Sequence, residues 1–186
     1  MLLLPAILWR EIEERTRSAL PLEACGFLIG RRRGEEFEVA ALAPGRNVAR
    51  EARTHFEIDA LDVLAAEDGA RDAGLEVLGV WHSHPRGPLS PSAADRGLEP
   101  AGRGGPGGTG ARGDSRGKVK NRQGTAAGAP SQWLTVIVVP EGTCESESDG
   151  RGTREGSAGI RLGCWRRVGA HGFEPLSVGQ PCQSRR

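Results

Sequence analysis

The feature that most constrains the fold is a glycine-rich tract in the middle of the chain. Eleven of the 35 residues from 97 to 131 are Gly, six are Lys or Arg, and only Leu98 and Val119 have large apolar side chains. Such a tract cannot bury enough apolar surface to offset the conformational entropy lost on ordering. We therefore interpret 97–131 as a mobile, basic, low-complexity insertion, so the core must be built from the residues on either side of it.

The bulk composition indicates one domain without a strong overall charge. A chain of 186 residues is long enough for one sizeable core and too short for two ordinary domains. Its 25 Lys and Arg residues nearly balance its 24 Asp and Glu residues, so no global field would hold it on nucleic acid or on an anionic membrane. We therefore expect neither a specific nucleic-acid partner nor a membrane partner.

Cysteine usage and the first residues indicate the compartment. The four cysteines lie far apart and form no C-x-x-C pair, which favours a reduced, intracellular protein. The apolar run Met1–Leu8 is short, lacks a basic leader and passes at once into charged residues. It supports neither secretion nor a membrane span, so we expect a cytoplasmic protein.

Periodicity and breakers predict helices and strands on both sides of the insertion. Apolar residues at helical spacing predict helices over 6–19 and 58–73, the first stopped by Pro21 and the second closed near Gly74. Apolar or alternating runs predict a hairpin with a basic turn at 31–34, then further strands, the last two on an edge. The predicted strands are Cys25–Gly30, Phe37–Leu42, Leu75–Trp81, Trp133–Val139, Ile160–Trp165 and Phe173–Val178. A second polar stretch, 141–159, is interpreted as a loop of the same 1–186 domain.

The stretch that follows the predicted strand Leu75–Trp81 has the spacing of a metal site. It reads His82-Ser-His84, then seven residues, then Ser92-x-x-Asp95. Side chains two apart on extended chain point the same way, so both imidazoles can face one ion. Ser92 can cap a short helix that presents Asp95 as the third ligand. Three N/O ligands leave one position open, which is typical of a catalytic zinc that lowers the pKa of a bound water.

Several segments together resemble one known family. The motif Gly79–Pro85 resembles the signature of the JAMM, or MPN-plus, zinc metalloproteases, which remove ubiquitin and ubiquitin-like proteins and include small prokaryotic members. Pro21–Gly30, Asn47 and Phe56–Asp59 are similar to its earlier segments. The resemblance covers residues 1–96 almost without a gap, whereas 97–131 and 141–159 depart from the small members. Together with the predicted elements, it implies a single α/β domain whose mixed β-sheet is flanked by helices.

Carried over position by position, the resemblance assigns roles to five residues. His82, His84 and Asp95 would hold one Zn²⁺ per chain. Glu23 would accept a proton from the attacking water and deliver it to the leaving amine, and Ser92 would hydrogen-bond the tetrahedral oxyanion. Taken alone, Glu23 is most simply a solvated carboxylate at a helix end, so its catalytic role depends on the resemblance.

The resemblance also implies the reaction. The protein would be a zinc metallopeptidase that hydrolyses a peptide or isopeptide bond, with the Gly-Gly tail of a ubiquitin-like or sulfur-carrier protein as substrate. Two alternatives stay open: an inactive MPN-type scaffold that binds without cleaving, and a small-molecule amide hydrolase that uses the same zinc site.

Other reactive side chains have simpler interpretations. A lone histidine is usually a surface or satisfied core residue, and we interpret His55 and His171 in that way. Cys25 lies close to Glu23, but a cysteine that enters a strand is more often a small buried hydrophobe than a nucleophile.

Overall fold

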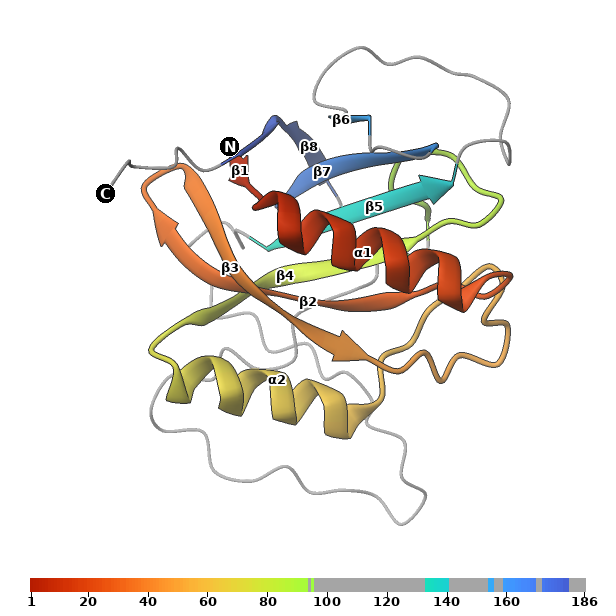
Figure 1. Ribbon diagram of the computed structural model, residues 1–186, viewed down its shortest axis with the longest axis horizontal. Coiled ribbons are helices and arrows are strands. Elements are labelled where there is room, and N and C mark those ends of the chain that lie inside the picture. The colour runs from red at the N-terminus through yellow and green to blue at the C-terminus, as the bar shows by residue number, and fades with distance from the viewer. Residues whose placement is uncertain (94, 96–132, 141–153, 156–158, 170–171, 181–186) are drawn as a thin grey trace.

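The computed structural model of the protein describes residues 1–93, 95, 133–140, 154–155, 159–169 and 172–180 (Figure 1). The predicted insertion 97–131 lies outside these residues, as do His171 and most of the polar stretch 141–159. Within that polar stretch the structure places a short strand, β6 (Arg154–Glu155), which pairs with the strand after it.

The described strands join into one mixed sheet, as predicted. Its order is β6, β7 (Ile160–Val168), β5 (Leu134–Pro140), β4 (Glu76–Ser83), β2 (Cys25–Arg33), β3 (Glu36–Gly45), β1 (Leu2–Leu3) and β9 (Val178–Gly179), with β8 (Gly172–Leu176) also paired to β7. β4 and β5 are parallel, and β1 is parallel to both of its neighbours. The remaining pairs are antiparallel.

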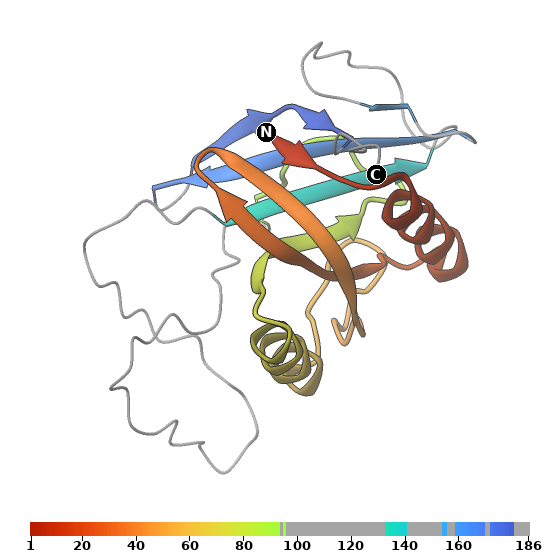
Figure 2. The same cartoon turned by 60° about the vertical axis from the view of Figure 1, so that its left-hand side comes forward.

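Two helices, α1 (Ala6–Ala19) and α2 (Ala60–Asp72), cover opposite faces of the sheet (Figure 2). Successive strand residues point to opposite faces, so neighbours along one strand belong to different cores. Leu28 packs in the core that contains Trp9 and Ile12 of α1. Phe27 packs in the core that contains Ala66 and Ala70 of α2. The predicted α/β arrangement, a mixed sheet flanked by helices, is confirmed among the described residues.

The hairpin is longer than the sequence analysis predicted. The basic residues expected to form its turn continue β2 as far as Arg33, and the turn is only two residues long, at 34–35. Glu38 lies opposite Arg31 and Glu36 opposite Arg33, and Arg33 Nε is 3.4 Å from Glu38 Oε2. Opposite charges across a pair of strands are stabilising. Gly34, with φ of +62°, takes the left-handed conformation that this turn requires.

The first residues form an element that the sequence analysis missed. β1 pairs in parallel with both β3 and β9, and Leu2 and Leu4 are buried. The predicted edge position of the late strands is wrong for β7, which lies between β5 on one side and β6 and β8 on the other. Among the described residues, no helix has both the length and the apolar character needed to cross a membrane.

Candidate metal centre

The two histidines of the motif converge at the end of β4. His82 is the next-to-last residue of the strand and His84 follows it, so both side chains point to the α2 face. Their Nε2 atoms are 3.0 Å apart. Asp95 reaches the same point, with Oδ1 3.2 Å from His82 Nε2 and Oδ2 3.6 Å from His84 Nε2. His82, His84 and Asp95, called the triad below, are all buried, and their ligand atoms lie within 4.8 Å of one another.

Asp95 is presented by the cap that its spacing from Ser92 predicts. Ser92 Oγ accepts a hydrogen bond from the Asp95 N–H (3.2 Å), and Asp95 Oδ2 accepts one from the Ser92 N–H (2.6 Å). This reciprocal pair is the arrangement of a capping box, which fixes both side chains against the backbone. The carboxylate is therefore aimed at the histidines by local bonds.

Contacts around the two imidazoles orient their rings. His84 Nδ1 donates to the Pro88 carbonyl at 2.8 Å, so Nδ1 carries the hydrogen and the lone pair of the neutral ring is on Nε2. The ring of His82 is stacked on Phe56, with centroids 4.3 Å apart. Two imidazole nitrogens and a carboxylate oxygen that converge on one buried point fit a zinc ion.

The protonation of the triad follows from burial and from its internal hydrogen bonds. Burial alone would raise the pKa of Asp95, but hydrogen bonds from the two histidines hold that pKa well below its usual range. Burial lowers the pKa of His82. Burial also acts to lower the pKa of His84, but hydrogen bonds to Asp95 and Pro88 outweigh it and raise that pKa. The Asp95 carboxylate is therefore ionised, and hydrogen bonds from the histidines stabilise its charge.

Glu23 reaches the same cleft through the pairing of β2 with β4. Cys25 lies opposite His82 in the register, and the pairing continues outward because the Ser83 N–H donates to the Ala24 carbonyl (2.9 Å) and the Ala24 N–H donates to Ser83 Oγ (2.8 Å). Glu23 is thus brought beside His84 on the α2 face. Its side chain is buried. Burial is the main cause that raises the pKa of Glu23 to about 7, with His84 acting against it and Asp95 with it.

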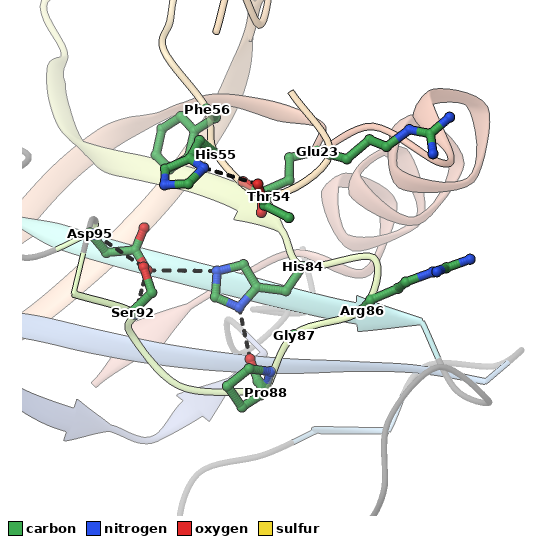
Figure 3. Close-up of a pocket in the computed structure, with 11 residues that line it drawn as sticks. Glu23, Thr54, His55, Phe56, His84, Arg86, Gly87, Pro88, Ser92 and Asp95 are labelled. Atoms are coloured by element: carbon green, nitrogen blue, oxygen red, sulfur yellow. Dashed lines mark hydrogen bonds and ion pairs between the residues drawn. The ribbon is translucent and has the colours of Figure 1, made fainter. Parts of the chain in front are cut away.

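The triad opens into a cleft, shown in Figure 3, of about 170 Å³. The loop that carries His55 lies across this cleft from the loop that carries Ser92. The cleft is lined by Glu23, Arg53, Thr54, His55, Phe56, His84, Arg86, Gly87, Pro88, Ser92 and Asp95. His55 is an exposed residue, as expected, but the sequence analysis did not place it at the site. Arg53 and Arg86 also line the cleft, although no sequence pattern marked either of them as a site residue.

Cys25 does not take part in this chemistry. Its side chain is buried, and burial together with the charges of Glu23 and Asp62 raises the pKa of its thiol to about 12. A protonated, buried thiol is a poor nucleophile. The interpretation of Cys25 as a small buried residue is confirmed.

Comparison with known protein families shows which family this chain belongs to. The family model described as prokaryotic homologs of the JAB domain matches residues 5–111, more than half of the chain. The chain belongs to this family. The resemblance to small prokaryotic JAMM-type proteins is therefore confirmed.

Curated relatives of this JAB-family chain have the names of enzymes. A desampylase of Haloferax volcanii is 37% identical over 76 residues, which are 41% of this chain and 53% of the relative. A probable TtuB-protein conjugate cleaving protease of Thermus thermophilus is 37% identical over 90 residues, which are 46% of this chain and 57% of the relative. The chain spans about half the length of the curated relatives it matches.

Two solved structures are similar in fold to this chain. A protein of Desulfitobacterium hafniense, known from its solution structure, has a TM-score of 0.64 and 24% identity, and covers 97% of this chain and 93% of its own. A protein of Salinibacter ruber has a TM-score of 0.54 and 25% identity, and covers 100% of this chain and 95% of its own.

Proposed function

We propose that this protein is a zinc-dependent peptidase that hydrolyses a peptide or isopeptide bond at the Gly-Gly tail of a ubiquitin-like or sulfur-carrier protein. The observation that carries the proposal is the buried triad with Glu23 in the same cleft. The names of the related enzymes, desampylase and conjugate cleaving protease, support the choice of substrate class.

The triad is proposed to hold one zinc ion. His82 and His84 would bind it through Nε2 and Asp95 through a carboxylate oxygen, because these are the atoms that converge. When bound, zinc supplies Lewis acidity, which lowers the pKa of water and polarises a carbonyl oxygen. The Pro88 carbonyl keeps the hydrogen of His84 on Nδ1 and so leaves Nε2 to coordinate.

Glu23 is proposed as the group that moves the proton. A general base works best when its pKa is close to the working pH, and burial already raises the pKa of Glu23 to about 7. A neighbouring dication would favour the ionised carboxylate, which is the form that accepts a proton. Glu23 would then take a proton from the attacking water and deliver it to the leaving amine.

Ser92 is proposed to stabilise negative charge on the oxygen of the scissile carbonyl. Its Oγ accepts the N–H of Asp95, so the hydroxyl hydrogen is left to donate toward the cleft. A hydrogen-bond donor placed where charge develops lowers the barrier of acyl transfer.

The size of the cleft favours a narrow substrate. At about 170 Å³ it is smaller than the roughly 300–1,000 Å³ of pockets that enclose a drug-sized ligand. Extended chain without bulky side chains fits such a cleft. A Gly-Gly tail meets this requirement, whereas the folded body of a carrier protein must remain outside.

The test is single-turnover cleavage of a Gly-Gly-tailed carrier fusion by zinc-loaded parent and Glu23→Gln side by side. Glutamine keeps the shape of the side chain but cannot accept the proton, so we expect zinc to stay bound while the rate falls about a hundredfold to ten-thousandfold. Glu14→Gln, an exposed position on α1, is the matched control and should cleave like the parent.

The alternatives give different results in the same assay. A zinc-loaded parent that binds the fusion without cleaving it would be a scaffold. Cleavage of small amides but of no carrier fusion would indicate a small-molecule amide hydrolase. Near-equal rates for parent and Glu23→Gln would refute the proton-transfer role of Glu23.

A further inference from the structure

Three basic side chains line the cleft beside the triad. Arg53 and His55 come from the loop between β3 and α2, and Arg86 comes from the loop after β4. All three residues are exposed, and none is used by the mechanism proposed above. Arginine stays charged at any physiological pH, so Arg53 and Arg86 bring positive charge to the cleft from two different loops. Arg53, His55 and Arg86 are called the basic wall below.

The loop that carries Arg53 and His55 is fixed to the site by Asn47. The Asn47 Nδ2 donates to the Glu23 carbonyl (3.0 Å) and to the His55 carbonyl (3.1 Å). Its Oδ1 accepts two further backbone N–H groups of the same loop. The Glu23 N–H donates in turn to the Ala52 carbonyl at 2.7 Å. The backbone beside Arg53 is therefore bound directly to the residue proposed to move the proton.

Arg53 has no carboxylate partner within the described part of the chain. Arg15, Arg71 and Arg166 each pair with a carboxylate, whereas no described residue forms a hydrogen bond or ion pair with the Arg53 guanidinium. Asp95, an acid of the same cleft, is bound by the two histidines. An anion from outside the chain can therefore bind Arg53 without displacing an existing ion pair.

We propose that the basic wall binds a carboxylate that the substrate carries close to the scissile bond, an inference that rests on the proposed peptidase function. A carboxylate matches the planar fork of arginine and forms charge-assisted hydrogen bonds, which are about twice as strong as neutral ones. Arg53 follows the residue bound to Glu23, and Arg86 lies two residues after His84. The carboxylate should therefore lie within one or two residues of the bond that is cut.

Two substrate sources can supply this group. One is the α-carboxylate of an amino acid that is released from the Gly-Gly tail, and the other is an acidic side chain beside the scissile bond. An isopeptide bond to a lysine side chain brings no α-carboxylate this close, so the first source would make the enzyme prefer a tail joined to an amino acid through its α-amine.

The test compares three N-acetylated peptides with zinc-loaded protein. They end in Gly-Gly-Ala with a free carboxylate, in Gly-Gly-Ala amide and in Gly-Gly-Asp amide. We expect kcat/KM for the free acid to exceed that for the Ala amide by about tenfold or more, the effect of one charge-assisted hydrogen bond. Arg53→Gln and Arg86→Gln should bring this ratio to within about twofold of unity. Arg50→Gln, an exposed arginine of the same loop that does not line the cleft, should keep the parent ratio.

Each result of this peptide assay either supports or overturns the proposed binding of a carboxylate. Equal cleavage of the free acid and the Ala amide by the parent overturns it while the peptidase function stands. A preference that survives in both cleft variants also overturns it. Efficient cleavage of the Asp amide would show that a side-chain carboxylate is enough for binding to the basic wall. Slow cleavage of the Asp amide would show that the basic wall requires the α-carboxylate.

If none of these short peptides is cleaved, the carrier-fusion assay still tests the proposed function, and binding decides the inference separately. Fluorescence anisotropy with labelled free-acid and amide peptides then measures the same preference without turnover. Tighter binding of the acid by the parent than by Arg53→Gln supports the basic wall, and equal affinities refute it.

Discussion

A single glycine beside His84 allows a steric test of the proposed metal centre. A Cβ atom built on Gly87 would lie 3.0 Å from His84 Cβ, 3.1 Å from Cγ and 3.2 Å from Nδ1. Nonbonded carbon atoms prefer about 3.5–4.0 Å, so in Gly87→Ala the imidazole must retreat by roughly 0.5 Å. That shift acts on a ring held by a 2.8 Å bond from Nδ1 to the Pro88 carbonyl. Loss of such a supporting bond typically weakens metal binding about 10- to 100-fold, which is the change we expect.

The assay is zinc titration against a chromophoric chelator, with thermal unfolding measured in parallel. Gly69→Ala is the matched control, because a Cβ at Gly69 meets no atom within 4 Å and the residue lies inside α2. That variant should keep the zinc affinity and gain about 1 kcal/mol of stability, the helix-propensity difference between Gly and Ala. Parent-like zinc affinity in Gly87→Ala would refute the argument that the space beside His84 determines its orientation.

Two further predictions concern the triad and Glu23. His82→Ala, His84→Ala and Asp95→Ala should each abolish tight zinc binding, because each removes one of three protein ligands; metal analysis that finds full occupancy in all three would contradict the assignment. In the absence of metal, burial raises the pKa of Glu23 from 4.5 to about 7, so the folded state binds its proton more tightly than the unfolded state and loses stability as pH rises from about 4.5 through 7. In thermal unfolding of the metal-free proteins, the melting temperature of Glu23→Gln relative to that of the parent should therefore rise as pH increases over this range. A difference in melting temperature that does not depend on pH would contradict the raised pKa of Glu23.

The convergence of the triad could be predicted from the sequence because its geometry is local. Two residues of extended chain bring His82 and His84 to one side, and a three-residue spacing lets Ser92 and Asp95 form a reciprocal cap. Neither relation needs a contact from far along the chain. The strand before the motif was also predictable, since a buried apolar run of this length has few alternatives.

The position of Glu23 could not be derived in the same way. It reaches His84 only because residue 24 pairs with residue 83 across β2 and β4, and the register of two distant strands is not written in the spacing of either. Only the resemblance to a family supplied that contact. The cleft residue His55 was missed for the same reason, because its position depends on the hydrogen bonds of Asn47 to Glu23 and to the loop.

The N-terminal strand shows a different limit. The run Met1–Leu8 has strong apolar character, but β1 contains only Leu2 and Leu3 and pairs in parallel with β3 and β9. A two-residue strand has no periodicity from which it could be recognised. Its burial depends on partners more than 30 residues away, so the sequence indicated an apolar segment without its place in the sheet.

The site lies at the carboxyl end of β4 for a reason set by strand direction. β4 and β5 are adjacent and parallel, and parallel neighbours require a long crossover between them. The crossover begins where β4 ends, and its first residues carry His84 and Asp95. The bonds that fix them are made locally, through Pro88 and Ser92, and through the His84 N–H, which donates to the Val138 carbonyl of β5 at 2.8 Å. The described contacts of the triad thus involve residues 82–95 and the end of β5, so we expect a change in the length of the connection after Asp95 to leave these contacts in place.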